Sequence, residues 1–139
     1  MNQIEHIGIA VKDLGNANKL FASLFGKSHY KIEEVASEGV KTSFFQMGPN
    51  KIELLEATNP ASPIAKFIEK KGEGIHHIAF AVNDIVSEIA RLKTAGFTVL
   101  NETPKTGADN KWVAFLHPKN TNSILVELCQ EIEGTHPAG

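Results

Sequence analysis

The stretch IEHIGIAVKDL, at residues 4–14, returns in altered form as IHHIAFAVNDI, at residues 75–85. His6 and His77 are 71 positions apart, and so are Asp13 and Asp84 (77 − 6 and 84 − 13). A copy that keeps its spacing in this way indicates an internal repeat, which has to be recognised before any local structure is assigned. We therefore interpret the chain as two related modules.

Each copy is followed by the pattern of an amphipathic helix. Asp13 and Asp84 stand where an N-cap would, and Gly26 and Gly96 stand where the helices should end. The apolar residues between these limits share one helical face. They are Leu14, Ala17, Phe21, Leu24 and Phe25 in the first copy, and Ile85, Ile89, Leu92 and Ala95 in the second.

Three segments typical of strands follow each predicted helix. They are YKIEEVAS (30–37), VKTSFFQM (40–47) and KIELLEA (51–57) in the first half, and FTVLNET (97–103), KWVAFLHP (111–118) and SILVELCQ (123–130) in the second. Both halves therefore read βαβββ. Between them, Ser62 suits an N-cap and Pro63 the first helical position, ahead of a short apolar stripe. This pattern predicts a connecting helix over 62–72.

The predicted fold is α+β, with two tandem βαβββ modules forming a curled mixed sheet around a cleft. At 139 residues, of which 42% are hydrophobic, the chain suits one domain or two small halves that share a core. We expect a single domain over 1–132, with module one at 1–60 and module two at 74–132. Residues 133–139 are predicted to be a flexible tail.

Composition excludes several classes of partner. The formal net charge is −2 and the 14 Lys and Arg residues are scattered, which leaves no basic stripe for nucleic acid or an anionic membrane. No run approaches the roughly 20 apolar residues of a membrane span, and the first residues do not resemble a signal peptide, so we expect a cytoplasmic protein. Cys129 is the single cysteine, which rules out an intramolecular disulfide and a Cys-based zinc cluster.

Two histidines and two glutamates occupy equivalent places in the repeat. His6 shares a strand face with small residues, as does His77, while Glu53 and Glu127 each lie between apolar neighbours in a strand. A buried carboxylate is costly unless something compensates it. A divalent metal is the natural compensator, because imidazole nitrogen and carboxylate oxygen suit Co, Mn, Ni, Fe or Zn. A hydrogen-bond network of the same four side chains is the alternative.

The tandem βαβββ pattern with its H…E…H…E order resembles the vicinal oxygen chelate superfamily, which includes glyoxalases, extradiol dioxygenases, fosfomycin-resistance proteins and methylmalonyl-CoA epimerases. Three segments resemble the epimerases in particular. They are HIGIAVKDL (6–14), SPIAKFIEKKGEGIHHIAFAV (62–82) and WVAFLHPKNTNSILVELCQ (112–130). The resemblance covers nearly the whole chain, from Ile4 to Gln130.

This resemblance implies a glyoxalase-type fold around a metal cleft, with metal ligands at His6, Glu53, His77 and Glu127. It also implies a homodimer and a divalent metal cofactor, cobalt being favoured and Mn²⁺, Ni²⁺ or Zn²⁺ possible. The implied substrate is a small-molecule acyl-CoA, and the implied reaction interconverts the C2 epimers of methylmalonyl-CoA by proton transfer through an enolate. Glu127 is the first candidate for a proton carrier. His76, on the opposite strand face from His77, is expected to be structural.

The second proton carrier is not assigned by the sequence. Some epimerases place a glutamate on the strand that here reads VKTSFFQM, and the matching residue is Thr42, which cannot act as a base near neutral pH. Glu53, Gln46 acting through a bound water, and His117 are the candidates that remain.

Two other functions stay open, together with the native metal and the acyl-chain specificity. A glyoxalase-type lactoylglutathione lyase would use the same ligand set, and a metal-free binding module would have the same fold. Lys105, Lys111 and Lys119 surround the loops of the second half, where they would either meet CoA phosphates or form a solvated face.

Overall fold

The computed structural model describes residues 1–132, so the predicted tail at 133–139 lies outside the described residues. The chain divides into two compact units. The first, His6–His77, is called here the N-terminal unit. The second, the C-terminal unit, consists of Met1–Glu5 and the chain from Ile78 onward.

The N-terminal unit contains the first βαβββ module. Its strands follow the order β2-β3-β4-β1, in which the pairs β2–β3 and β3–β4 are antiparallel and β1 runs parallel to β4. The elements are β1 (Gln3–Ala10), α1 (Leu14–Phe25), β2 (Lys31–Val35), β3 (Val40–Met47), β4 (Asn50–Ala57) and α2 (Pro63–Lys71), with a 3₁₀ turn at Ala36–Glu38.

The C-terminal unit repeats this arrangement. Its strands follow the order β5-β8-β7-β6, with β5 parallel to β8 and the remaining pairs antiparallel. The elements are β5 (Gly74–Ala81), α3 (Ile85–Thr94), β6 (Lys105–Gly107), β7 (Lys111–Leu116) and β8 (Val126–Glu131), with a 3₁₀ turn at Pro118–Asn120. The predicted duplication of a βαβββ module is confirmed, and the fold class is α+β with mixed parallel and antiparallel strands.

The strand predicted at 97–103 is wrong. That segment makes only one isolated bridge to β7, at Val99, and the short β6 comes later, at Lys105. The reason is a side chain: the amide of Asn101 accepts from the backbone N–H of Phe115 and donates to the carbonyl of Val113. Those groups of β7 are therefore bonded by a side chain, where a strand would have bonded them through its backbone.

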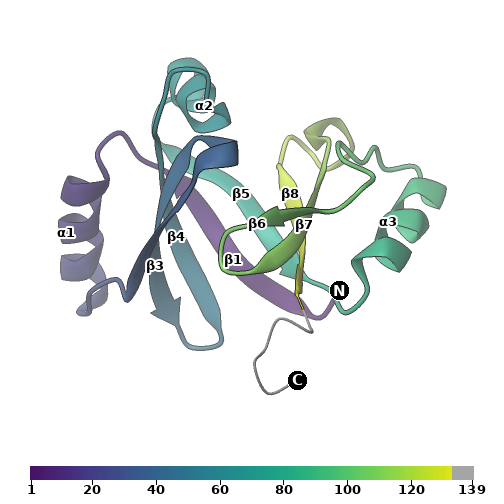
Figure 1. The fold of residues 1–139 in the computed structure, drawn as a ribbon, viewed down its shortest axis with the longest axis horizontal. Helices are drawn as coiled ribbons and strands as arrows, with labels where there is room; N and C mark the ends of the chain where they lie inside the picture. The colour runs from purple at the N-terminus through teal and green to yellow at the C-terminus, as the bar shows by residue number, and fades with distance from the viewer. Residues whose placement is uncertain (133–139) are drawn as a thin grey trace. The chain divides into compact units, whose positions relative to one another are not determined.

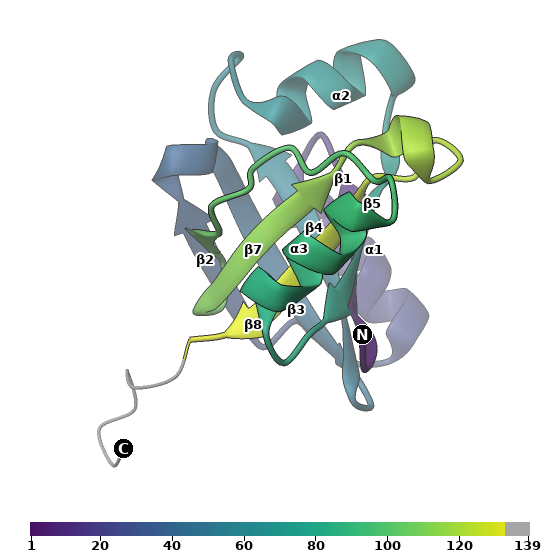
Figure 2. The ribbon, with the colours of Figure 1, turned by 90° about the vertical axis from the view of Figure 1, so that its right-hand side faces the viewer.

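Each long helix covers one face of the strands in its own unit (Figures 1 and 2). In the N-terminal unit, α1 packs on β3 and β4, and α2 packs on β4. In the C-terminal unit, α3 packs on β7 and β8. The core under α1 includes Phe45 and Leu54, and the core under α3 includes Leu116 and Leu128. Because side chains alternate along a strand, Glu53 lies on the face away from α1. No helix within residues 1–132 is long and apolar enough to cross a membrane.

Candidate metal centre

The strand register brings a small residue, a carboxylate and an aromatic ring into one row on the face away from α1. Gly8 of β1 lies opposite Glu53 of β4, which lies opposite Phe44 of β3. Residues paired in this way project from the same face of a sheet. His6, two positions before Gly8 in β1, shares that face. Within this row Glu53 is buried, at 4% exposure.

His6 and His77 face each other through the same ring nitrogen. Their Nε2 atoms are 2.9 Å apart, and the rings meet edge to face with centroids 5.0 Å apart. The other nitrogen of His6, Nδ1, lies 3.1 Å from Oε2 of Glu53. Both histidines are buried, at 5% and 6% exposure. The N-terminal unit thus brings together three of the four residues predicted to be ligands.

Gly8 makes room for the ring of His77. A Cβ atom built on Gly8 would stand 2.3 Å from Cε1 of that ring and 2.8 Å from its Nε2. Such distances do not occur between real atoms, so any larger residue at position 8 would displace His77. Gly8, two positions after His6, is therefore required for the two histidine rings to lie where they do.

A third imidazole joins this pair. Nδ1 of His76 lies 2.9 Å from Nδ1 of His77, and the His76 ring packs edge to face against Phe67 of α2. Burial lowers the pKa of His76 to about 4. Burial is also the main cause that lowers the pKa of His77 well below 6.5, and the neighbouring His6 and His76 lower it further. Both rings are therefore neutral near pH 7, which is the form that can bind a metal.

Glu127 occupies the equivalent place in the C-terminal unit. It is 6% exposed on β8, and the register pairs it with Ala79 of β5 and Phe115 of β7. The row Ala79, Glu127, Phe115 corresponds to the row of Gly8, Glu53 and Phe44 in the other unit. The repeat seen in the sequence therefore extends to the environment of each carboxylate within its own unit.

The residues of the N-terminal unit fit a divalent cation. Two adjacent ligands of a metal with bonds of about 2.1 Å lie about 3 Å apart when the bonds are at right angles, and the two Nε2 atoms are 2.9 Å apart. Glu53 holds the other nitrogen of His6, a partner that metal-binding histidines commonly have. Imidazole with carboxylate suits Co, Mn, Ni or Zn. The buried cluster therefore suggests a metal site, without identifying the ion.

Two of the candidate proton carriers have local structural roles. Nε2 of Gln46 donates to the carbonyls of Gly48 and Asn50, which holds the turn between β3 and β4. Nδ1 of His117 accepts from the backbone N–H of Lys119 and caps a 3₁₀ turn. Nε2 of Gln46 and Nδ1 of His117 are therefore engaged in local structure.

The register also places a carboxylate that sequence reasoning missed. Glu33 of the edge strand β2 lies opposite Thr42 of β3, which in turn lies opposite Leu55 of β4. All three project from the face that carries Glu53. Alternation along β2 was visible in the sequence, but which of Glu33 and Glu34 shares the face of Glu53 depends on the register with β3.

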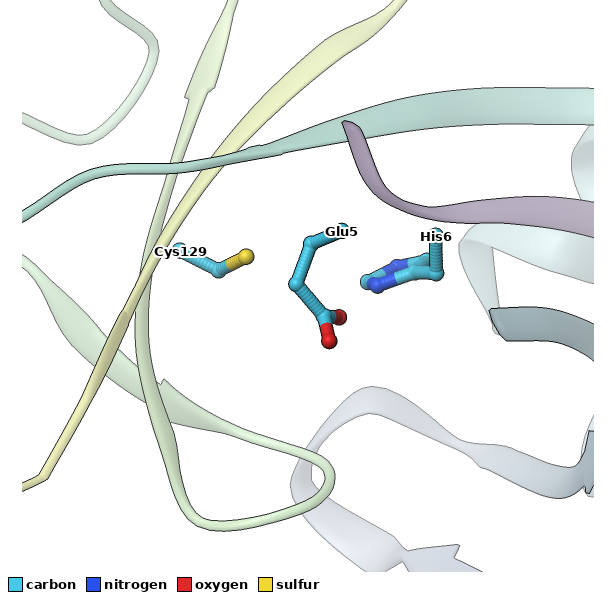
Figure 3. A group of neighbouring side chains, drawn as sticks. All are labelled: Glu5, His6 and Cys129. Atoms are coloured by element: carbon cyan, nitrogen blue, oxygen red, sulfur yellow. The ribbon is translucent and has the colours of Figure 1, made fainter. Parts of the chain in front are cut away.

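Cys129 is a buried free thiol. It is 2% exposed on β8, and its thiol donates to the carbonyl of Phe80 across 3.6 Å. Within the C-terminal unit its sulfur lies within 4.8 Å of a carboxylate oxygen of Glu5, and Figure 3 shows the two as neighbouring side chains. A thiol and one carboxylate are too few ligands for a metal site of their own.

Comparison with known proteins agrees with this geometry. An ethylmalonyl-CoA/methylmalonyl-CoA epimerase of Cereibacter sphaeroides is 42% identical over 132 residues, covering 94% of this chain and 98% of that protein. A hypothetical protein of Bacillus halodurans has a structure that matches with a TM-score of 0.92 at 41% identity, covering 97% of this chain and 98% of its own. A variant of Streptomyces coelicolor methylmalonyl-CoA epimerase, in complex with 2-nitronate-propionyl-CoA, matches with a TM-score of 0.91 at 31% identity over 99% of both chains.

The structural matches confirm the predicted glyoxalase-like fold, whereas the homodimer stays a prediction from the sequence. The sequence profile of one family matches residues 5–115, which is most of the chain. The chain belongs to the glyoxalase/bleomycin resistance protein/dioxygenase superfamily, and its relatives within it include methylmalonyl-CoA epimerases.

Proposed function

We propose that this protein is an epimerase that interconverts the two C2 epimers of methylmalonyl-CoA. The observation that carries the proposal is the buried pair of histidines, with Nε2 atoms 2.9 Å apart and a carboxylate on His6. This pair occurs in a chain that is 42% identical to an ethylmalonyl-CoA/methylmalonyl-CoA epimerase across nearly the full length of both. A metal-free binding module would have no use for such a pair.

We propose His6, Glu53, His77 and Glu127 as the residues that hold the metal. When bound, the ion would supply a Lewis acid for the acyl oxygens of the substrate. In the metal-free protein Glu53 lies on Nδ1 of His6, 3.1 Å away, so it has to turn from that nitrogen toward the Nε2 side of the ring to bind the ion. Glu127 is included because the repeat gives it the same buried row that Glu53 occupies. The low exposure of all four keeps water away from their donor atoms.

Epimerisation needs a proton carrier on each side of C2, because the proton leaves one face and returns to the other. We propose Glu127 as one carrier and Glu33 as the second. Thr42 cannot carry a proton near neutral pH, but Glu33 lies directly opposite Thr42 and shares its sheet face. At intermediate exposure on an edge strand, the Glu33 carboxylate can meet both substrate and solvent.

The reaction is tested by incubating one epimer of methylmalonyl-CoA with metal-loaded protein in deuterium oxide. We expect both epimers to form with solvent deuterium at C2. Glu127→Gln should lower turnover by about a hundredfold or more, the scale expected when a proton carrier at a metal is lost. Ethylmalonyl-CoA and a saturated acyl-CoA without the second carboxylate extend the assay to acyl-chain specificity.

Two results would contradict the proposal at different points. Metal-loaded protein that never exchanges the C2 proton is not an epimerase of this substrate, and methylglyoxal with glutathione then becomes the substrate pair to assay, as for a glyoxalase-type lyase. If Glu127→Gln retains its metal and turns over normally, Glu127 is not a proton carrier, although the epimerase function stands.

A further inference from the structure

His76 is a partly buried imidazole of the N-terminal unit that the proposed ligand set does not use. The sequence predicted a structural role, because alternation along β5 puts His76 on the other face from His77. The two rings nevertheless meet through their Nδ1 atoms, 2.9 Å apart. Phe67 of α2 fixes the orientation of the His76 ring from the other side, with ring centroids 5.0 Å apart.

The hydrogen bonds run in one direction along the chain of rings. An ionised carboxylate can only accept, so Nδ1–H of His6 donates to Glu53 across 3.1 Å. When His6 is neutral, its single N–H is the one that faces Glu53, so Nε2 of His6 accepts and Nε2–H of His77 is its donor, across 2.9 Å. Nδ1 of His77 then has no proton and accepts from Nδ1–H of His76. With His6 neutral, the network therefore assigns the tautomer of all three rings in the metal-free protein.

Metal binding requires the opposite tautomer of His77. Its Nε2 has to present a lone pair, so its proton has to be on Nδ1, where it faces Nδ1 of His76. His76 then has to accept, with its own proton on Nε2. A neutral imidazole at position 76 can take either role, and the neutral pair neither gains nor loses a proton in the change.

We propose that His76 is a positioning residue that sets the tautomer of His77. It donates to Nδ1 of His77 in the metal-free protein and accepts from the same atom once Nε2 binds the ion. The proposal rests on the metal centre of the proposed function, and it does not depend on the identity of the substrate. Partners of this kind usually alter metal affinity ten- to a hundredfold when they are removed.

The tautomers can be measured directly by nitrogen-15 NMR of the histidine rings, with zinc as the ion because it is diamagnetic. In the metal-free protein we expect the proton of His77 on Nε2, and in the zinc-loaded protein we expect it on Nδ1. Leucine at position 76 can neither donate a hydrogen bond to Nδ1 of His77 nor accept one from it. Asparagine can do either, because its side-chain amide has an N–H group and a carbonyl. His76→Leu should therefore weaken zinc binding by about ten- to a hundredfold, and His76→Asn should restore most of the affinity.

His29→Leu is the matched control, because His29 is also a partly buried histidine of the N-terminal unit and packs against Phe45, outside the proposed ligand set. It should bind zinc as the wild type does. A metal-free protein with the His77 proton on Nδ1 would overturn the proposal, and so would unchanged zinc affinity in His76→Leu. If the wild type binds no zinc, the proposed metal centre itself fails, which is a different outcome from the loss of the His76 role alone.

Discussion

The position of His77 depends on the absence of a side chain at Gly8. A Cβ atom on Gly8 would stand 2.3 Å from Cε1 of His77. The register pairs Gly8 with Glu53 of β4. A methyl group at position 8 and the observed His77 ring cannot occupy the same space. The Nε2 separation of 2.9 Å between His6 and His77 therefore requires glycine at this position.

Gly8→Ala should weaken metal binding at least tenfold, because displacing His77 separates the two Nε2 atoms. Overpacking of this kind also costs about 1 to 3 kcal/mol of unfolding free energy. Calorimetric titration with cobalt and chemical denaturation measure the two effects. The control is Gly15→Ala in α1, where the added Cβ would meet its nearest atom, Oδ1 of Asp13, at an ordinary 3.5 Å. Wild-type cobalt affinity in Gly8→Ala would show that His77 need not stay where it lies.

At the scale of the element, helix limits were predictable because capping is local. Asp13 accepts from the N–H of Asn16, and Gly26 ends α1 with a φ of 73°. Strand limits depend on partners far away in the sequence. Pairing of the segment 97–103 with β7 is limited to Val99, because the side chain of Asn101 accepts from the N–H of Phe115. The histidine pair was predictable from the repeat, whereas the place of Glu33 required the register of β2 on β3.

Strand alternation provides a matched test of Glu33. Glu33 shares the sheet face of Thr42, whereas Glu34 is exposed and projects from the other face. If Glu33 carries a proton, Glu33→Gln should lower the rate of epimerisation by about a hundredfold, and Glu34→Gln should leave it unchanged. Deuterium exchange at C2, measured on each epimer separately, shows from which epimer the variant no longer removes the proton. Equal rates for the two variants would exclude Glu33 from the proton transfer.

The N-cap of α3 predicts a dependence of stability on pH. Hydrogen bonds from the backbone and side chain of Ser87 lower the pKa of Asp84 below its ordinary value. The folded state therefore holds this proton less tightly than the unfolded state, so the contribution to stability is present above about pH 4 and is lost as the pH falls through the folded pKa. Denaturation from pH 6 to pH 3 should show a smaller loss in Asp84→Asn than in the wild type. Asparagine retains the cap and cannot titrate, so parallel curves would mean that Asp84 contributes nothing.

At the scale of the whole molecule, the duplication supplies the proposed ligand set in two halves. His6, Glu53 and His77 belong to the N-terminal unit, and Glu127 belongs to the C-terminal unit. Glu53 lies on the strand face away from α1, and Glu127 lies on the strand face away from α3. The duplication therefore gives the two carboxylates equivalent places in their modules. A buried carboxylate is costly unless it is compensated. The stability of the chain should therefore depend on the ion that both carboxylates are proposed to hold.

Removing the metal should lower the melting temperature, and cobalt or manganese should restore it. An ion that binds only the folded state at a concentration one hundred times its Kd adds about 2.7 kcal/mol of stability. For a chain of this size that corresponds to a shift of roughly 5 to 10 °C. Calorimetry on chelated and reloaded protein measures the shift, and Glu127→Gln should reduce it if Glu127 is a ligand. An equal shift in the wild type and Glu127→Gln would restrict the ligands to the N-terminal unit, and no shift in either would mean that the carboxylates are compensated by hydrogen bonds alone.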